Sequence, residues 1–210
     1  IKMLLREVLP RIVATQPGGK TVSAIVYDSK TDLVPFLGGE EMASLEKHPD
    51  KVIIFNPLDE RAKALDIAAG VTNRLQVKTI AEQMIPADPE KLGPNYYFSK
   101  AAQNILAKVI LGLHIHLPQR WTLKDLVIIC QNEKLMRRLL AADPATSAIL
   151  EEHFQEGPTC HSIRSTLATY LGELEEIAMI WDQLALRGRT FTASDFVNQS
   201  RLLVLGNNHR

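Results

Sequence analysis

The chain has 210 residues, 46% of them hydrophobic and 23% charged, the composition of an ordinary soluble globular protein. Lysine plus arginine and aspartate plus glutamate each total 24, so no overall field indicates nucleic-acid binding, and any basic surface must be local. Cys130 and Cys160 lack metal-site spacing and favour a reducing cytosolic setting, and no apolar stretch is long enough to span a bilayer.

The first segment, residues 1–9, has the apolar spacing of a helix but no N-cap, so we expect the chain to begin inside a longer helix. Residues 14–21 then fit a loose phosphate-loop pattern, with Ala14 in the first glycine position and Lys20-Thr21 at the end. A true phosphate loop follows a strand and opens a helix, whereas here a helix precedes and a strand follows. This context favours an exposed turn.

Three short apolar runs predict strands: residues 23–28, 51–56 and 202–205. The first two do not alternate with polar residues, which is typical of parallel strands buried on both faces. Each ends in a polar, turn-forming cluster. In open α/β sheets the ligand lies beyond the carboxyl ends of such strands, so these clusters are candidate site segments.

Residues 61–188 change to helical spacing, with six or seven predicted helices and no convincing strand. The predicted segments include 62–69, 77–85, 95–113, 122–129, 132–140, 147–154 and one long helix over 162–186. Thr122 and Asp125 form a predicted capping box. The fold class is therefore α/β, part of a parallel sheet with a large inserted all-α domain, divided as 1–60, 61–188 and 189–210.

The end of the first strand carries Asp28, Lys30 and Asp32. An acid there can bind Mg²⁺ through water, orient an attacking water or contact a nucleotide. An Asx-type turn with a solvated lysine and aspartate accounts for the same residues. Position favours the first interpretation and composition the second, so both are open.

The end of the second strand reads Asn56-Pro57-Leu58-Asp59-Glu60-Arg61. Turn chemistry accounts for every residue here, with Asp59 and Glu60 placed to stabilise the N-terminus of a following helix. Arg61 is also a candidate contact to a nucleotide phosphate.

A small basic cluster, Lys134, Arg137 and Arg138, is a candidate contact to DNA phosphates or to a partner. A solvated helix face is the commoner explanation of such a cluster in a chain without net charge. The histidines lack the spacing of a metal site, so we expect no metal ligands and no Ser/His/Asp or Cys/His arrangement.

Four segments together resemble the conjugative coupling proteins of type IV secretion, the TraD/TraG-like DNA-translocating ATPases. Residues 24–32 are similar to the family's strand ending in Asp-Pro-Lys-Gly-Asp, with Ser29 and Thr31 in place of Pro and Gly. Residues 53–61 are close to its Asn-Pro-Leu/Phe-Asp-x-Arg segment. Residues 97–102 resemble the Phe-Trp-x-x-Ala-Ala start of a long helix, and residues 191–205 resemble the Phe-Ser-Ile-Arg-Asp-Trp return to the sheet.

This resemblance implies a RecA-like nucleotide-binding core, an inserted all-α domain, a hexamer, and ATP-driven movement of DNA and its relaxase to a type IV secretion channel. It places Asp28, Lys30, Asp32 and Arg61 near the edge of a nucleotide site. The protein would be the cytoplasmic portion of a bacterial inner-membrane-associated protein. The family's phosphate loop and acidic Walker B strand would fall outside these residues, so we expect ATP and Mg²⁺ in the intact parent only and no hydrolysis by this chain alone.

Two other functions are compatible with the same residues. One is a non-catalytic helical module that binds DNA or a protein, with the strands as scaffold. The other is a RecA-like secretion or pilus motor ATPase without a DNA substrate.

Overall fold

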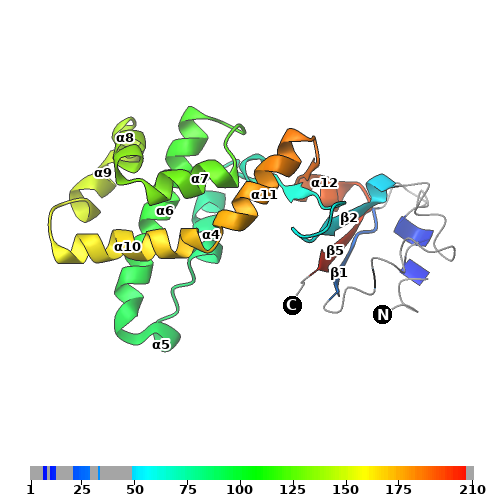
Figure 1. Cartoon of the computed structure of the whole chain (residues 1–210), viewed down its shortest axis with the longest axis horizontal. Helices are drawn as coiled ribbons and strands as arrows, with labels where there is room; N and C mark the ends of the chain where they lie inside the picture. The colour runs from blue at the N-terminus through cyan, green and yellow to red at the C-terminus, as the bar shows by residue number, and fades with distance from the viewer. Residues whose placement is uncertain (1–6, 9, 13–20, 29–32, 34–48, 207–210) are drawn as a thin grey trace. The chain divides into compact units, whose positions relative to one another are not determined.

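A computed structural model of the protein describes residues 7–8, 10–12, 21–28, 33 and 49–206 (Figure 1). The chain forms two compact units. One consists of residues 1–66 together with 183–210 and holds a parallel sheet, and the other, residues 67–182, is helical. We call them the sheet unit and the helical unit.

Three parallel strands form the sheet of the first unit: β1 (Ala24–Asp28), β2 (Val52–Phe55) and β5 (Leu202–Gly206). A short 3₁₀ turn, η3 (Pro49–Lys51), precedes β2. The strand order is β1-β5-β2, so the last strand lies between the two early ones (Figure 1). The prediction of parallel strands interrupted by helices is confirmed.

Both faces of the sheet carry apolar residues, because side chains alternate along each strand. On one face, Leu202 and Val204 pack with Ile12 and Leu33. On the other face, Ile53 and Leu203 pack with Phe191.

The edge strand β1 departs from the prediction of burial on both faces. Ile25 is 59% exposed and Tyr27 54% exposed, while Ala24 and Val26 pack against the first face. The prediction of burial on both faces was wrong for this strand, because the face that carries Ile25 and Tyr27 is only partly covered.

A second, two-stranded parallel sheet joins β3 (Ala64–Leu65) to β4 (Thr190–Phe191). The N–H groups of Ala64 and Asp66 donate to the carbonyls of Arg189 and Phe191, each at 2.9 Å. The predicted helix over 62–69, and with it the expectation of no strand in 61–188, was therefore wrong. The structure of this segment depends on hydrogen-bond partners more than 120 residues away in the sequence. The local spacing of apolar residues cannot reveal such partners.

Phe191 then enters the sheet unit's core, where its ring meets that of Phe55 edge-on at 5.8 Å. The next residue, Thr192, accepts a hydrogen bond from the N–H of Asp195 and begins α12 (Ala193–Asn198). This short helix leads into β5.

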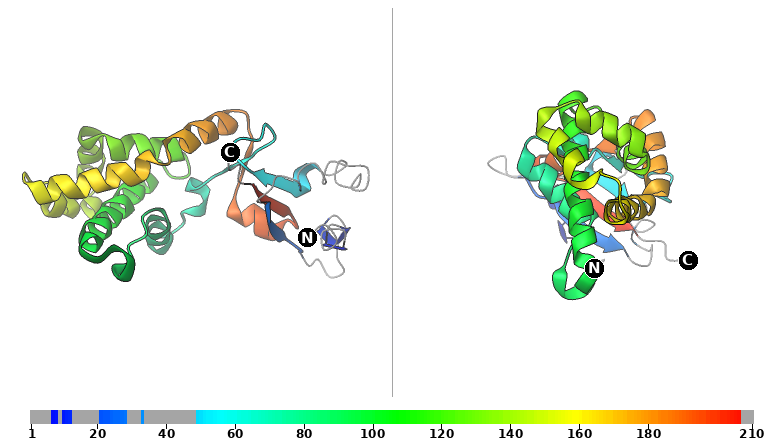
Figure 2. Two further views of the ribbon diagram at one scale, coloured as in Figure 1. Left: turned by 60° about the horizontal axis from the view of Figure 1, so that its bottom comes forward. Right: turned by 90° about the vertical axis from the view of Figure 1, so that its left-hand side faces the viewer.

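The helical unit is built around α6 (Tyr96–His116), and five other helices of the unit pack against it (Figures 1 and 2). The other elements between residues 67 and 186 are η4 (Ala68–Gly70), α4 (Arg74–Met84), α5 (Pro89–Leu92), η5 (Gly93–Asn95), α7 (Leu123–Gln131), α8 (Glu133–Ala141), α9 (Pro144–His153), α10 (Pro158–Gly172) and α11 (Glu175–Leu186).

Polar side chains mark where these helices begin. Asn73 and Gln76 form a capping box at α4, and the predicted box of Thr122 and Asp125 begins α7. Each box satisfies N–H groups that a helix leaves without an internal partner. The starts of α4 and α7 are therefore encoded locally.

The predicted single helix over 162–186 is two helices. α10 ends at Gly172, and α11 starts at Glu175. The N–H of Leu174 donates to the carbonyl of Leu171 at 3.1 Å, a tighter turn than an α-helix makes. Glycine is a poor helix former, so Gly172 is a natural place for the break.

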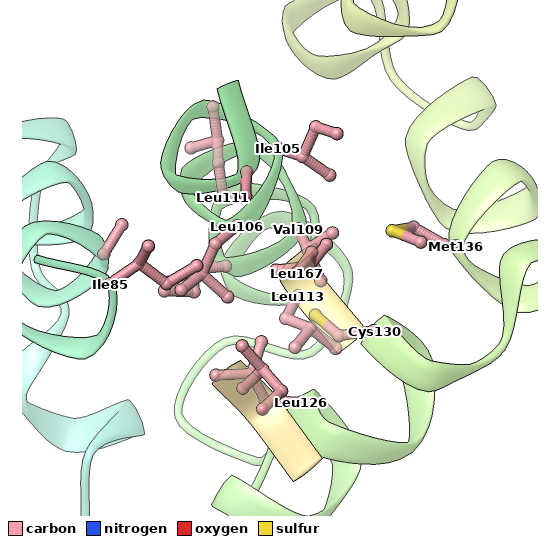
Figure 3. Packing of buried hydrophobic residues seen from close by; sticks show 14 of the residues in the cluster. Ile85, Ile105, Leu106, Val109, Leu111, Leu113, Leu126, Cys130, Met136 and Leu167 are labelled. Atoms are coloured by element: carbon pink, nitrogen blue, oxygen red, sulfur yellow. The ribbon is translucent and has the colours of Figure 1, made fainter. Parts of the chain in front are cut away.

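The core of the helical unit surrounds α6 (Figure 3). Leu106 and Val109 of α6 are fully buried, and they share this core with Leu126 and Cys130 of α7 and Leu167 of α10. Burial raises the pKa of the Cys130 thiol, so this side chain acts as an unreactive apolar residue.

We predict that Leu106→Ala lowers the free energy of unfolding of the helical unit by about 2–5 kcal/mol, because it leaves a cavity in a closely packed core. Both tryptophans of the chain, Trp121 and Trp181, belong to this unit, so urea unfolding followed by their fluorescence reports on it. The control is Leu75→Ala at a side chain that is 74% exposed, which should change stability by less than about 0.5 kcal/mol. Equal losses in the two variants would contradict the assignment of the core.

Candidate functional site

The carboxyl ends of β1 and β2 meet at Gly206, the last residue of β5. In the strand register Asp28 pairs with Gly206, and Phe55 pairs with Leu205. Asn56 follows Phe55 and therefore lies at the level of Gly206 on its other side. Three residues that are far apart in the sequence, Asp28, Asn56 and Gly206, thus form one sheet edge.

Gly206 is required there because Asn56 occupies the space of a side chain. A Cβ atom on Gly206 would lie 2.9 Å from both Cβ and Nδ2 of Asn56, closer than real contacts of this kind. Asn56 is only 7% exposed. The absence of a side chain on β5 therefore lets the turn after β2 close over the strand end.

Asp28 is 4% exposed at this edge, and its Oδ2 accepts a hydrogen bond from the backbone N–H of Leu33 at 2.9 Å. The carboxylate thus links the end of β1 to Leu33, five residues further on, a longer span than the two residues of an Asx turn. Lys30 and Asp32 lie outside the described residues, as do positions 14–20 of the phosphate-loop-like segment.

The turn after β2 is held by two successive Asx-type hydrogen bonds. Asn56 Oδ1 accepts from the N–H of Leu58 at 3.1 Å, and Asp59 Oδ1 accepts from the N–H of Arg61 at 2.8 Å. The backbone N–H of Lys63 then donates to Ile54 at 3.0 Å, which returns the chain alongside β2. No helix follows this turn, so the predicted role of Asp59 and Glu60 at a helix N-terminus was wrong.

Arg61 is held by Asp59 in a two-point contact. Its Nε and Nη2 donate to the Asp59 carboxylate at 3.0 and 2.9 Å. The hydrogen bond from Arg61 lowers the pKa of Asp59, and the same bond raises the pKa of Arg61. The Arg61 side chain is 61% exposed, and its other N–H groups can bind an anionic oxygen.

The predicted basic cluster lies on α8 in the helical unit, and its members differ in their contacts. Lys134 and Arg138 are exposed. Arg137 forms an ion pair with Glu133 at 2.8 Å and donates to the carbonyl of Phe154. Its guanidinium also lies 5.1 Å from the centre of the Phe154 ring. Lys134 and Arg138 are therefore the members available to an external anion.

Arg164 of α10 also belongs to this cluster, although it was not among the residues predicted from the sequence. It contacts Glu133 at 3.2 Å and donates to the carbonyl of His153 at 3.0 Å, and its guanidinium lies 5.6 Å from the Phe154 ring centre. Both arginines contribute to a pKa of Glu133 below its ordinary value, with the hydrogen bond from Arg137 as the largest cause. The cluster joins α8 to α10 and to the end of α9.

Among the described residues, no group of three or more His, Cys, Asp or Glu residues is arranged to hold a metal ion. None of the described helices is long and apolar enough to cross a membrane.

The family model of the type IV secretion-system coupling protein DNA-binding domain matches residues 3–207. The chain belongs to this family. The resemblance found in the four sequence segments is therefore confirmed at the family level, over almost the whole chain.

Solved coupling-protein structures share the fold. The bacterial conjugative coupling protein TrwBdeltaN70, in an unbound form, matches with a TM-score of 0.63 at 16% identity, over 89% of this chain. TrwB in complex with ADP and Mg²⁺ matches with a TM-score of 0.62 at 15% identity, and TrwB with the non-hydrolysable analogue ADPNP with 0.60 at 13%. The predicted fold class, part of a RecA-like sheet with an inserted all-α domain, is confirmed.

The chain spans 40% of the length of each of these three solved chains. No curated protein sequence matches it.

We predict that Gly206→Ala destabilises the sheet edge by about 1–3 kcal/mol, because the new methyl group must displace Asn56 or the strand end. Hydrogen exchange of the β1 and β2 amides should become faster. Gly70→Ala is the matched control, since a Cβ there meets no atom within 4 Å. Unchanged exchange in the Gly206 variant would contradict the packing described above.

We predict that Arg61→Met raises the pKa of Asp59 toward the ordinary carboxyl value of about 3.9. The measurement is an NMR titration of the Asp59 carboxyl carbon. Because the folded-state pKa is lowered, the stabilisation by this pair is present above the ordinary carboxyl pKa and is lost as pH falls through the lowered value. The thermal midpoint of the variant should accordingly approach that of the wild type in acid.

The matched control is Arg187→Met at an exposed arginine, which should leave the Asp59 titration unchanged. An Asp59 pKa that stays low in Arg61→Met would show that another group lowers it.

Proposed function

We propose that the chain is part of an ATP-driven coupling protein that moves DNA, with its bound relaxase, to a type IV secretion channel. The observation that carries this proposal is the match of residues 3–207 to the coupling-protein DNA-binding domain family. The parent protein would be a homo-oligomer, a hexamer as the family resemblance implies, at the cytoplasmic side of a bacterial inner membrane. Domain bounds of 1–60, 61–188 and 189–210 remain part of this proposal.

In this proposal the sheet edge at Asp28, Asn56 and Gly206 faces a nucleotide. The solved relatives in complex with ADP and Mg²⁺ and with ADPNP support a nucleotide in the parent. Arg61 fits a phosphate oxygen, because Asp59 orients its guanidinium and leaves N–H groups unused. Lys30 and Asp32 are proposed neighbours of the same nucleotide.

The family resemblance places the acidic Walker B strand outside these residues, and we propose that Mg²⁺ accompanies the nucleotide in the intact parent protein. We therefore assign neither Mg²⁺ nor the catalytic step to a residue of this chain. Its proposed contribution is to orient the nucleotide at the sheet edge and to contact DNA through the helical unit.

On the helical unit, Lys134 and Arg138 are the proposed DNA contacts. They are one turn apart on α8, so they share a face, and neither forms an ion pair with another described residue. Arg137 is proposed to position α8 rather than to contact DNA, because its guanidinium is committed to Glu133 and Phe154.

We predict that the double variant Lys134→Gln/Arg138→Gln weakens binding of a fluorescein-labelled DNA duplex by about tenfold in low salt and reduces the salt slope by about two. Fluorescence anisotropy at several salt concentrations measures both. The matched control, Lys91→Gln/Arg120→Gln, removes two exposed charges elsewhere in the helical unit and should bind like the wild type. Wild-type affinity and slope in the α8 variant would refute this DNA contact, and an absence of salt-dependent DNA binding by the chain would refute the proposed DNA role.

A further inference from the structure

A cleft of about 330 Å³ lies between α4, α6 and α9 in the helical unit, away from the residues assigned above. We propose that this cleft binds an acidic peptide segment of a partner protein, with one apolar side chain on its floor and carboxylates at its rim. This inference goes beyond the proposed DNA and nucleotide functions and does not depend on them.

The helical period builds the cleft from both sides. On α4, the lining residues Arg74, Val77, Lys78 and Ala81 recur at intervals of three or four and so share one face. The facing residues of α6 are Gln103, Asn104, Ala107, Lys108 and Leu111, and α9 adds Ile149 and Glu152. The two faces pack against each other, so the cleft belongs to one rigid part of the fold.

The floor of the cleft is apolar. Val77, Leu111 and Ile149 are each at most 9% exposed and belong to the core of the unit, so the floor is a fixed surface. Apolar clefts with a few polar groups at the edge are the usual form of binding sites. An aliphatic side chain of a partner fits such a floor.

The rim is cationic, with three basic residues and one acid. Arg74 forms no ion pair or hydrogen bond with any residue that the structure describes. Lys78 has an exposed side chain and only a weak contact, 3.7 Å, to Glu82. Lys108 is positioned by a hydrogen bond of 2.8 Å from its Nζ to the carbonyl of Ala145, which leaves two of its N–H groups for a ligand.

Glu152 does not neutralise the rim. Its carboxylate is 64% exposed and lies 3.8 Å from His153. Asn104 is exposed and makes no hydrogen bond within the described part of the chain, so its amide can pair with a peptide backbone.

The surroundings favour a short acidic segment over a nucleic acid. The helical unit carries eleven Lys and Arg residues but thirteen Asp and Glu residues, so the cationic rim is a local exception. A peptide with a few carboxylates can pair with the three basic residues of the rim alone, whereas a long polyanion would extend beyond them.

The test uses a fluorescein-labelled peptide with one leucine flanked by two glutamates on each side, titrated with the 210-residue chain and followed by anisotropy. Two matched peptides replace the glutamates by glutamine or the leucine by alanine. We expect saturable binding of the first peptide at low salt, about tenfold tighter than either matched peptide, and weaker as salt is added.

The variant Arg74→Glu/Lys78→Glu should lose at least about tenfold in peptide affinity, because it reverses two rim charges. The control Lys91→Glu/Arg120→Glu makes the same change of charge elsewhere in the helical unit and should bind the peptide almost as the wild type does. Circular dichroism is used to check that both variants are folded.

Four outcomes would overturn the proposal. The first is an absence of saturable binding, the second is equal binding of the glutamine peptide, and the third is an equal loss in the Lys91→Glu/Arg120→Glu control. Binding of a DNA oligonucleotide that depends on Arg74 and Lys78 more strongly than peptide binding does would also overturn it.

Discussion

The hydrogen bonding of β5 to both β1 and β2 is the constraint on which the sheet unit depends. It joins the end of the described chain to two strands near its beginning, with residues 56–201 in between. Closing a loop of this length has a length-dependent entropic cost of about 4 kcal/mol, which the buried residues of the two sheet faces must offset. The edge formed by Asp28, Asn56 and Gly206 exists only when this closure has occurred.

The helical unit escapes this constraint, because its own core is continuous within residues 67–182. Helices that pack on near neighbours in sequence form mostly local contacts, which favours fast folding, whereas parallel strands pair slowly. The helical unit can therefore be ordered before β5 finds its place. If the helices fold first, β5 finds its partner strands more easily, because the folded helices replace most of the flexible loop between β2 and β5.

Much of this architecture is predictable from local sequence. The three apolar strands, the capping box of Thr122 and Asp125, and the amphipathic spacing of α6 carry their structure within a few residues. The segment 62–69 was mispredicted because its structure depends on pairing with β4, and the break after Gly172 because a good apolar spacing continues across it. Long-range pairing explains the first of these errors, and a local turn explains the second.

The candidate sites show the same division between local and long-range information. Asp28 and Arg61 are visible in the sequence because they follow strands, but the need for Gly206 depends on the space that Asn56 occupies. The three basic residues of α8 look equivalent in sequence, yet Glu133 and Phe154 engage the guanidinium of Arg137. Such differences arise from partners that no local pattern identifies.

The exposed face of β1 has a consequence for handling the protein. Ile25 and Tyr27 present apolar surface on a strand whose outer edge pairs with no described strand. Unpaired backbone beside apolar side chains is a template for pairing with another chain, so this edge is where self-association of a concentrated preparation would begin. An added charge on this face of β1 would oppose such pairing.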